Sequence, residues 1–111
     1  MATDIHTTAI VDKAASIDEG VSIGPFCVIG GGAKIGKGSR LQSHVQVEGK
    51  TEIGEGCQIY PFACIGFPPQ DTKYRGEETA VKIGDNNIIR EYVTIHRASV
   101  GGDGVTTIGN N

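Results

Sequence analysis

An aliphatic residue recurs at every sixth position from Ile5 to Ile65 of this 111-residue chain. These positions are Ile5, Val11, Ile17, Ile23, Ile29, Ile35, Leu41, Val47, Ile53, Ile59 and Ile65. The residue four places after each aliphatic is small, as at Cys27, Ser39 and Ala63. A period of six fits neither the 3.6-residue repeat of a helical face nor the alternation of a hairpin. It is typical of a parallel β-helix, in which each hexad is a short strand plus a corner and the stacked coils share one core.

Two interruptions of the hexad rhythm predict loops. The first is a polar, proline-containing segment over 67–79, and the second is a glycine-rich segment over 99–104. If three hexads make one triangular coil and each interruption is an insertion, the aliphatic positions form three ladders that continue through Ile83, Ile89, Ile95 and Ile108. The sequence therefore predicts an all-β fold, a single β-helix domain over 1–111 with about five coils. Both loops should leave the same corner, in adjacent coils.

The same count gathers chemistry-bearing residues at that corner. His96 should lie directly above Gly66 at the root of the longer loop, in the neighbourhood of Asp71, Lys73 and Arg97. From the residues alone, a solvated polar turn explains Asp71 and Lys73 better than a binding site does.

Four outward residues predict an interface. Phe26 and Phe62 are separated by two coils, His44 lies midway, and Tyr92 comes next once the long loop is discounted. They should form one vertical stripe on the outside of the helix. Scattered surface aromatics are common, but alignment in one column favours a contact between copies of the chain.

Composition excludes several functional classes. Glycine accounts for 17 residues and aromatics for only 5%, which suits corners and short strands better than a layered globule. The net charge of −3 offers no basic footprint for nucleic acid. No stretch approaches the ~20 apolar residues of a membrane span.

The cysteines and histidines do not predict a metal site or a disulfide. Cys27 and Cys57 occupy small inward positions and Cys64 an outward one, so reduced cysteines that pack as small hydrophobes are expected. The three histidines fall on different coils and share no rim, whereas a catalytic zinc needs three converging ligands. We expect neither a metal nor a cofactor.

Five segments carry a more specific pattern than the hexads. They are Gly24-Pro25-Phe26-Cys27, Gln42-Ser43-His44, Pro69-Gln70-Asp71-Thr72-Lys73-Tyr74-Arg75-Gly76-Glu77, Ile83-Gly84-Asp85-Asn86-Asn87 and Val93-Thr94-Ile95-His96-Arg97. Together they resemble the acyl-[acyl-carrier-protein]–UDP-N-acetylglucosamine O-acyltransferase family along the whole chain. The hexads are common to many transferases and specify only the fold, whereas segments 69–77 and 93–97 are more specific to this family.

The resemblance implies a left-handed β-helix in a cytoplasmic homotrimer with active sites between subunits. It also implies transfer of a 3-hydroxyacyl chain from acyl-carrier protein to the 3-hydroxyl of UDP-N-acetylglucosamine, the first step of lipid A synthesis. Asp71 and Lys73 match loop residues that contact substrate in the family, and His96 matches a supporting residue of the active site. The stripe of Phe26, His44, Phe62 and Tyr92 is the expected trimer interface.

One departure from the family pattern concerns the general base. In the family this base is a histidine of an Ala-His-x-Ala-His-Asp motif, which is expected beyond Asn111, as are the later coils and a C-terminal helical domain. We therefore expect the chain to be the N-terminal part of the enzyme, inactive alone. The alternative is a non-catalytic, self-assembling trimeric scaffold, as a natural remnant or an engineered truncation.

Overall fold

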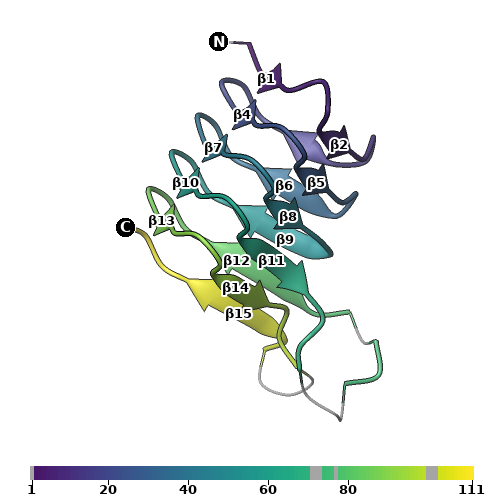
Figure 1. The fold of residues 1–111 in the computed structure, drawn as a ribbon. Coiled ribbons are helices and arrows are strands. Elements are labelled where there is room, and N and C mark those ends of the chain that lie inside the picture. The colour runs from purple at the N-terminus through teal and green to yellow at the C-terminus, as the bar shows by residue number, and fades with distance from the viewer. Residues whose placement is uncertain (1, 71–73, 77, 100–102) are drawn as a thin grey trace.

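The chain folds as a left-handed parallel β-helix of stacked triangular coils (Figure 1). The computed structural model describes residues 2–70, 74–76, 78–99 and 103–111. All regular structure in these residues consists of short strands, β1 to β15, arranged in three five-stranded sheets. The predicted all-β architecture with about five coils is confirmed.

Each sheet takes one strand from every coil. Sheet A contains β1 (Asp4–Ile5), β4 (Ser22–Ile23), β7 (Arg40–Leu41), β10 (Gln58–Ile59) and β13 (Ile88–Ile89). Sheet B contains β2 (Ile10–Val11), β5 (Val28–Ile29), β8 (Gln46–Val47), β11 (Cys64–Phe67) and β14 (Thr94–His96). Sheet C contains β3 (Ser16–Ile17), β6 (Ala33–Ile35), β9 (Lys50–Ile53), β12 (Ala80–Ile83) and β15 (Val105–Ile108).

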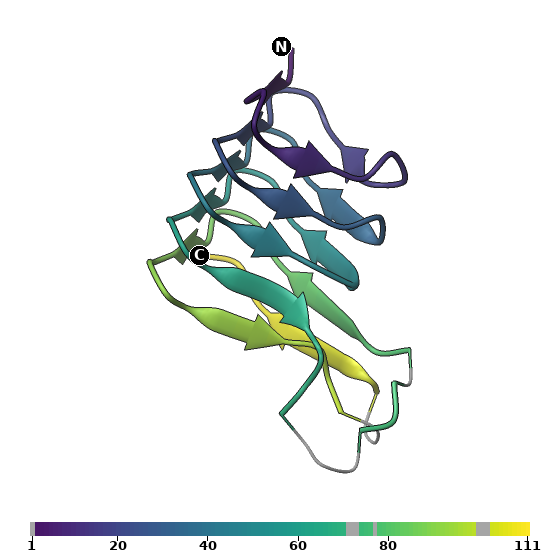
Figure 2. The same cartoon turned by 45° about the vertical axis from the view of Figure 1, so that its right-hand side comes forward.

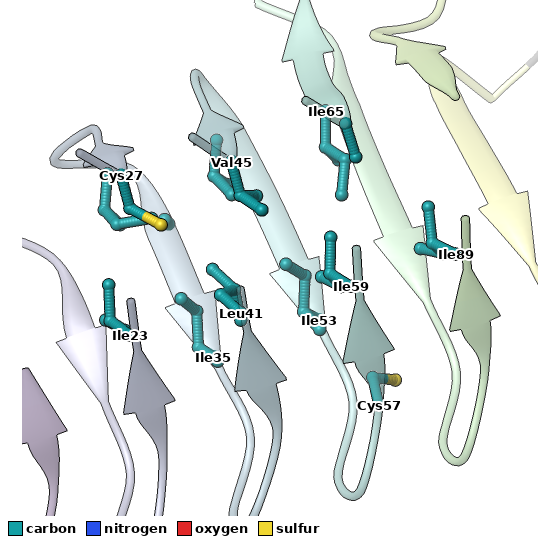
Figure 3. Close-up of a cluster of buried hydrophobic side chains, with 14 of the residues drawn as sticks. Ile23, Cys27, Ile35, Leu41, Val45, Ile53, Cys57, Ile59, Ile65 and Ile89 are labelled. Atoms are coloured by element: carbon teal, nitrogen blue, oxygen red, sulfur yellow. The ribbon is translucent and has the colours of Figure 1, made fainter. Parts of the chain in front are cut away.

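The hexad aliphatics form the core in the predicted register. In sheet A, Ile23 pairs with Leu41 and Leu41 with Ile59, and each is at most 2% exposed. Figure 3 shows these side chains following one another along the interior of the stack. Ile5 differs from the expectation, because it is 41% exposed where a neighbouring coil covers only one side of it.

Small inward positions also join one coil to the next through hydrogen bonds. Ser39 Oγ donates to the carbonyl of Gly54 at 2.7 Å, and Asn87 Nδ2 donates to the carbonyl of Gly109 at 2.6 Å. Cys57 Sγ occupies the same column and donates to the carbonyl of Gly84 at 3.2 Å. These buried polar groups are therefore satisfied inside the stack, as stable cores require.

The cysteines are free, as expected from their positions. Cys27 and Cys57 are buried and Cys64 is half-buried. Burial raises the pKa of the Cys27 thiol. A buried thiol with a raised pKa has little thiolate and therefore little reactivity.

Both long connections leave the corner between sheets B and C (Figure 2). One joins β11 to β12 and the other joins β14 to β15, in adjacent coils. The prediction that the two loops share one corner is confirmed.

The predicted position of His96 above Gly66 is wrong by one residue. Ile65 pairs with Ile95, but the next pair is Phe67 with His96, so the register shifts at Gly66. Gly66 has a φ of 88°, and a Cβ there would collide with the Glu48 carbonyl oxygen and Thr51 Oγ1. The strand thus bulges at Gly66, a position that only glycine can occupy, and His96 stands opposite Phe67.

Candidate functional site

The loop corner presents His96 at the end of β14. The residue is half-buried, and its ring Nδ1 lies 3.0 Å from the carbonyl oxygen of Pro68, the first residue after β11. One nitrogen of the ring is thus held by the backbone at the root of the longer loop. The sequence analysis placed His96 at this root correctly but assigned it the wrong strand partner.

Arg97 braces the same corner. Its backbone N–H donates to the Phe67 carbonyl at 2.8 Å, so the two strand ends stay joined beyond the bulge. Its side chain lies over Gly49, where a Cβ would come 3.0 Å from both Cδ and Nε of Arg97. Arg97 Nε is buried and finds no hydrogen-bond acceptor in the described part of the chain. The sequence placed Arg97 in this neighbourhood but gave it no role.

The two loop residues predicted to contact substrate, Asp71 and Lys73, lie outside the described residues. Their contact with substrate stays a prediction. The described residues on either side, Gln70 and Tyr74, continue the polar character of the loop.

In the described ranges, no three His, Cys, Asp or Glu side chains gather as metal ligands would. His6 lies in the first coil, where its Nδ1 contacts Thr8 Oγ1 at 2.9 Å, far along the stack from His96. We also find no membrane-spanning helix among the residues that the structure describes.

The corner between sheets A and B carries the predicted aromatic stripe. Phe26 stacks on His44 with ring centroids 5.1 Å apart, and His44 stacks on Phe62 at 4.8 Å. Phe62 stacks on Tyr92 at 5.3 Å. The column expected from two-coil spacing is confirmed, and its outer surface is open: Phe26 is 57% exposed and Tyr92 74%.

The stripe residues have a backbone conformation that bulky residues rarely adopt. Their φ angles are positive, at 60° for Phe26, 59° for His44, 69° for Phe62 and 62° for Tyr92. At the corner between sheets C and A, the equivalent positive-φ positions hold Gly20, Gly38, Gly56 and Asn86. Glycine and asparagine tolerate this region with little strain, whereas phenylalanine does not. The backbone alone therefore does not explain aromatic residues here, which favours a role for their exposed rings.

Exposed aliphatic residues extend the apolar surface on both sides of the stripe. On sheet B, Ile10 is 66% exposed and pairs with Val28, which follows Phe26 by two residues and is 37% exposed. On sheet A, Ile88 is 62% exposed and precedes Tyr92 by four residues. The sequence analysis missed these neighbours. The available signal was an outward aliphatic directly before an inward one, as in the pairs Ile10-Val11 and Ile88-Ile89.

A charged group borders the stripe at Tyr92. The Arg90 guanidinium lies 4.3 Å from the centre of the Tyr60 ring and pairs with Glu91 at 3.0 Å. The hydrogen bond and charge of Glu91 raise the pKa of Arg90. A polar rim around an apolar centre is the usual arrangement of a protein–protein interface.

Comparisons with known proteins give one consistent family. The family described as "Bacterial transferase hexapeptide (six repeats)" matches residues 14–49 and 32–66. The acyl-[acyl-carrier-protein]–UDP-N-acetylglucosamine O-acyltransferase of Thermodesulfovibrio yellowstonii is 65% identical over 108 residues, which cover 97% of this chain and 42% of that relative.

Solved structures agree with the sequence comparison. The UDP-N-acetylglucosamine O-acyltransferase (LpxA) of Moraxella catarrhalis superposes with a TM-score of 0.92 at 51% identity, over 96% of this chain and 41% of that one. LpxA of Acinetobacter baumannii gives a TM-score of 0.94 at 49% identity, with 96% and 41% covered. The chain thus spans about two fifths of the length of the relatives that it matches.

Proposed function

Because the chain belongs to the acyl-[acyl-carrier-protein]–UDP-N-acetylglucosamine O-acyltransferase family, we propose that it supplies one wall of that enzyme's active site. The reaction is the transfer of a 3-hydroxyacyl chain from acyl-carrier protein to the 3-hydroxyl of UDP-N-acetylglucosamine. The observation that carries the proposal is the loop corner, where His96 stands at the root of one connection and begins the other.

The corner residues have different roles in this proposal. Asp71 and Lys73, on the longer loop, contact the substrate. His96 supports them from the rigid strand end, where the carbonyl of Pro68 holds its ring. Rigid placement of binding groups matters because correct positioning supplies much of the rate acceleration of an enzyme.

In this proposal the general base is the histidine of the Ala-His-x-Ala-His-Asp motif that the family resemblance implies beyond Asn111, and His96 keeps a supporting role. His6 is in the first coil and His44 is stacked between two phenylalanines, so neither reaches the loop corner. A base must come within hydrogen-bond reach of the acceptor hydroxyl, and its loss alone typically lowers the rate by about 10²–10⁴. The chain should therefore show no measurable transfer by itself.

The stripe serves association into a trimer in this proposal. Its four stacked rings, with the exposed Ile10, Val28 and Ile88 on the two neighbouring sheets, present more apolar surface than scattered surface aromatics would give. Three copies related by a closed rotation would each bury this surface against a neighbour. The cytoplasmic location, inferred from the family resemblance, belongs to the same proposal.

The test is an acyl-transfer assay with radiolabelled UDP-N-acetylglucosamine and 3-hydroxyacyl-acyl-carrier protein. The 111-residue chain is compared with a chain extended through the later coils to the length of its relatives. We expect turnover only from the extended chain, and a drop in that turnover for Asp71→Ala and Lys73→Ala. Lys34→Ala, an exposed change on the outer face of sheet C, is the matched control and should behave as the parent.

Two outcomes would contradict the proposal. An extended chain that transfers no acyl group would favour the alternative, a non-catalytic scaffold. Turnover by the 111-residue chain at a similar rate would mean that the base lies within it, and His96 would be the first residue to replace.

A further inference from the structure

Two buried side-chain polar atoms in the described part of the chain lack a hydrogen-bond partner, and both lie at the loop corner. They are Nε of Arg97 and Oγ1 of Thr79. Arg97 directly follows β14, and Thr79 is the last residue of the longer loop before β12. Buried polar groups in native proteins are almost always hydrogen-bonded, so two exceptions at one corner point to a shared partner.

Thr79 stands at the edge of sheet C where the longer loop returns to the stack. Ala80 pairs with Lys50 in the coil above. The residues that precede this pair, Thr79 and Gly49, therefore begin the same side of two adjacent coils. The Ala80 N–H donates to the carbonyl of Gly104 at 3.0 Å, which joins this edge to the coil below. Thr79 is only 7% exposed, so bulk water does not reach its hydroxyl freely.

The Arg97 side chain reaches the same edge. A Cβ added to Gly49 would lie 3.0 Å from Arg97 Nε, so this atom is next to the residue with which Thr79 is aligned. The Arg97 backbone N–H donates to the carbonyl of Phe67 at 2.8 Å. Phe67 is the last residue of β11, where the longer loop leaves the stack. Arg97 is thus bonded to the start of this loop and lies beside the place where it ends.

The two unpartnered atoms can be satisfied together by one water molecule. The Nε of arginine can only donate a hydrogen bond, whereas a threonine hydroxyl can donate or accept. A water between them accepts from Nε and makes a second hydrogen bond with the hydroxyl. Such bridging waters are nearly as favourable as direct hydrogen bonds. Among the described residues no carboxylate pairs with Arg97 and competes for this contact.

We propose that Arg97 and Thr79 are positioning residues of the acyltransferase, and that a water-bridged link between Arg97 Nε and the Thr79 hydroxyl fixes the two ends of the longer loop. This inference rests on the proposed function, in which Asp71 and Lys73 of that loop contact the substrate. Arg97 and Thr79 do not touch the substrate themselves. They act on the rate through placement, because an error of about 1 Å in a positioned group can cost on the order of 100-fold in rate.

The first experiment tests the link without substrate. NMR of the 111-residue chain follows the chemical shift of the Arg97 Nε proton and its exchange with solvent, and Arg97→Lys identifies the signal. Thr79→Val removes the hydroxyl but keeps the shape of the side chain. It should shift this signal and speed the exchange by about tenfold, the effect of one lost hydrogen bond, whereas Thr79→Ser should resemble the parent.

Thr107→Val is the matched control for this experiment, because Thr107 is exposed in β15 on the same sheet. It should leave the Arg97 signal unchanged. The proposal is overturned if Thr79→Val has no effect on the Arg97 Nε proton, or if Thr79→Ser has the same effect as Thr79→Val.

The second experiment asks whether the link acts through the loop. In the extended chain, kcat/KM is measured for Thr79→Val, for Lys73→Ala and for the two together. We expect Thr79→Val to lower kcat/KM by about tenfold and Thr79→Ser to retain most of the activity. The loss caused by Lys73→Ala should be smaller in the Thr79→Val background, because a displaced loop no longer places Lys73 correctly. Fully additive losses would overturn the proposal, since a general loss of stability acts independently of Lys73.

A second variant makes the test independent of how well Thr79→Val folds. Arg97→Lys keeps the positive charge but has no Nε–H at the position of the link. It should lower kcat/KM about as much as Thr79→Val, and the two changes together should cost little more than either alone. Parent-like activity of Arg97→Lys would overturn the proposal.

Failure of this inference is distinguishable from failure of the proposed function. The Arg97 Nε proton is measured without substrate or turnover, so the link is tested even if the extended chain transfers no acyl group. Conversely, an extended chain that is active and unaffected by Thr79→Val would leave the proposed function intact and refute this inference.

Discussion

Replacing Phe62 with glycine should abolish self-association, and it should also destabilise the single chain. Phe62 has a φ of 69° and stacks between His44 and Tyr92 at 4.8 and 5.3 Å. Glycine would relieve ~1 kcal/mol of backbone strain at this angle. It would also remove two ring contacts, each worth about 0.5–1.5 kcal/mol. Together the two ring contacts contribute ~1–3 kcal/mol. The part of the Phe62 ring that is already covered in the single chain contributes further apolar burial. The losses therefore exceed the relief of strain, and the single chain is destabilised by a few kcal/mol.

The effect on association comes in addition, because association depends on the part of the ring that is still exposed in the single chain. A phenylalanine buries roughly 150–250 Å² when it is fully enclosed. Since Phe62 is 45% exposed in the single chain, ~70–110 Å² remains to be covered by a neighbour. At ~25 cal/mol per Å² this is ~2–3 kcal/mol for each chain. Over three chains the loss is ~5–8 kcal/mol, or about four to six powers of ten in the association constant.

The assay is sedimentation equilibrium at micromolar concentration, combined with urea unfolding of the dissociated chain. Asn86→Gly is the matched control, because Asn86 has a similar φ of 58° but lies at the corner between sheets C and A, away from the stripe. Because asparagine tolerates this region with little strain, this change should alter neither backbone strain nor association appreciably. The reasoning is refuted if Phe62→Gly assembles like the parent, or if the parent is itself a stable monomer.

Three further changes test the fold and its charges. Ile29→Asp puts an unpaired carboxylate at a position that is 1% exposed and should lower the free energy of unfolding by several kcal/mol; a urea midpoint no lower than that of the parent would mean that the inward register is wrong. Gly66→Ala combines a φ of 88° with a clash against the Glu48 carbonyl and should destabilise by ~2–5 kcal/mol in the same assay, whereas full stability would show that the bulge can move. Lys37 and Glu19 pair at 2.9 Å, which lowers the pKa of Glu19 and raises that of Lys37. This stabilisation is therefore lost as the pH falls through the lowered pKa of Glu19 or rises through the raised pKa of Lys37. Since both side chains are exposed, Glu19→Gln should change thermal stability slightly and only at low salt; a large, salt-independent change would contradict this account.

The candidate site was predictable from the sequence only where it depends on the length of a coil. Counting residues placed His96 at the root of the longer loop and placed both loops at one corner. The roles of Asp71 and Lys73 came from a resemblance rather than from the count, and these residues lie outside the described structure. The position of the Arg97 side chain, with its unpartnered Nε, was not predictable, because it depends on the close contact with Gly49 two coils away.

The sequence by itself determined the stack and its vertical columns. Each coil repeats the same inward aliphatic positions, and parallel strands in register turn a fixed spacing along the chain into vertical alignment. Residue spacing alone therefore predicted that four residues share one column, and the observed stacking of their rings confirms it. These residues are Phe26, His44, Phe62 and Tyr92.

Only the tertiary structure decided what happens where one coil touches the next. The register shifts at Gly66, where the backbone lies so close to the Glu48 carbonyl and Thr51 Oγ1 that no Cβ would fit, and the period of six contains no information about this close approach. The shift moves His96 from Gly66 to Phe67 and brings its Nδ1 within 3.0 Å of the Pro68 carbonyl. A repeat specifies which residues share a column, but the positions of individual atoms depend on packing between coils.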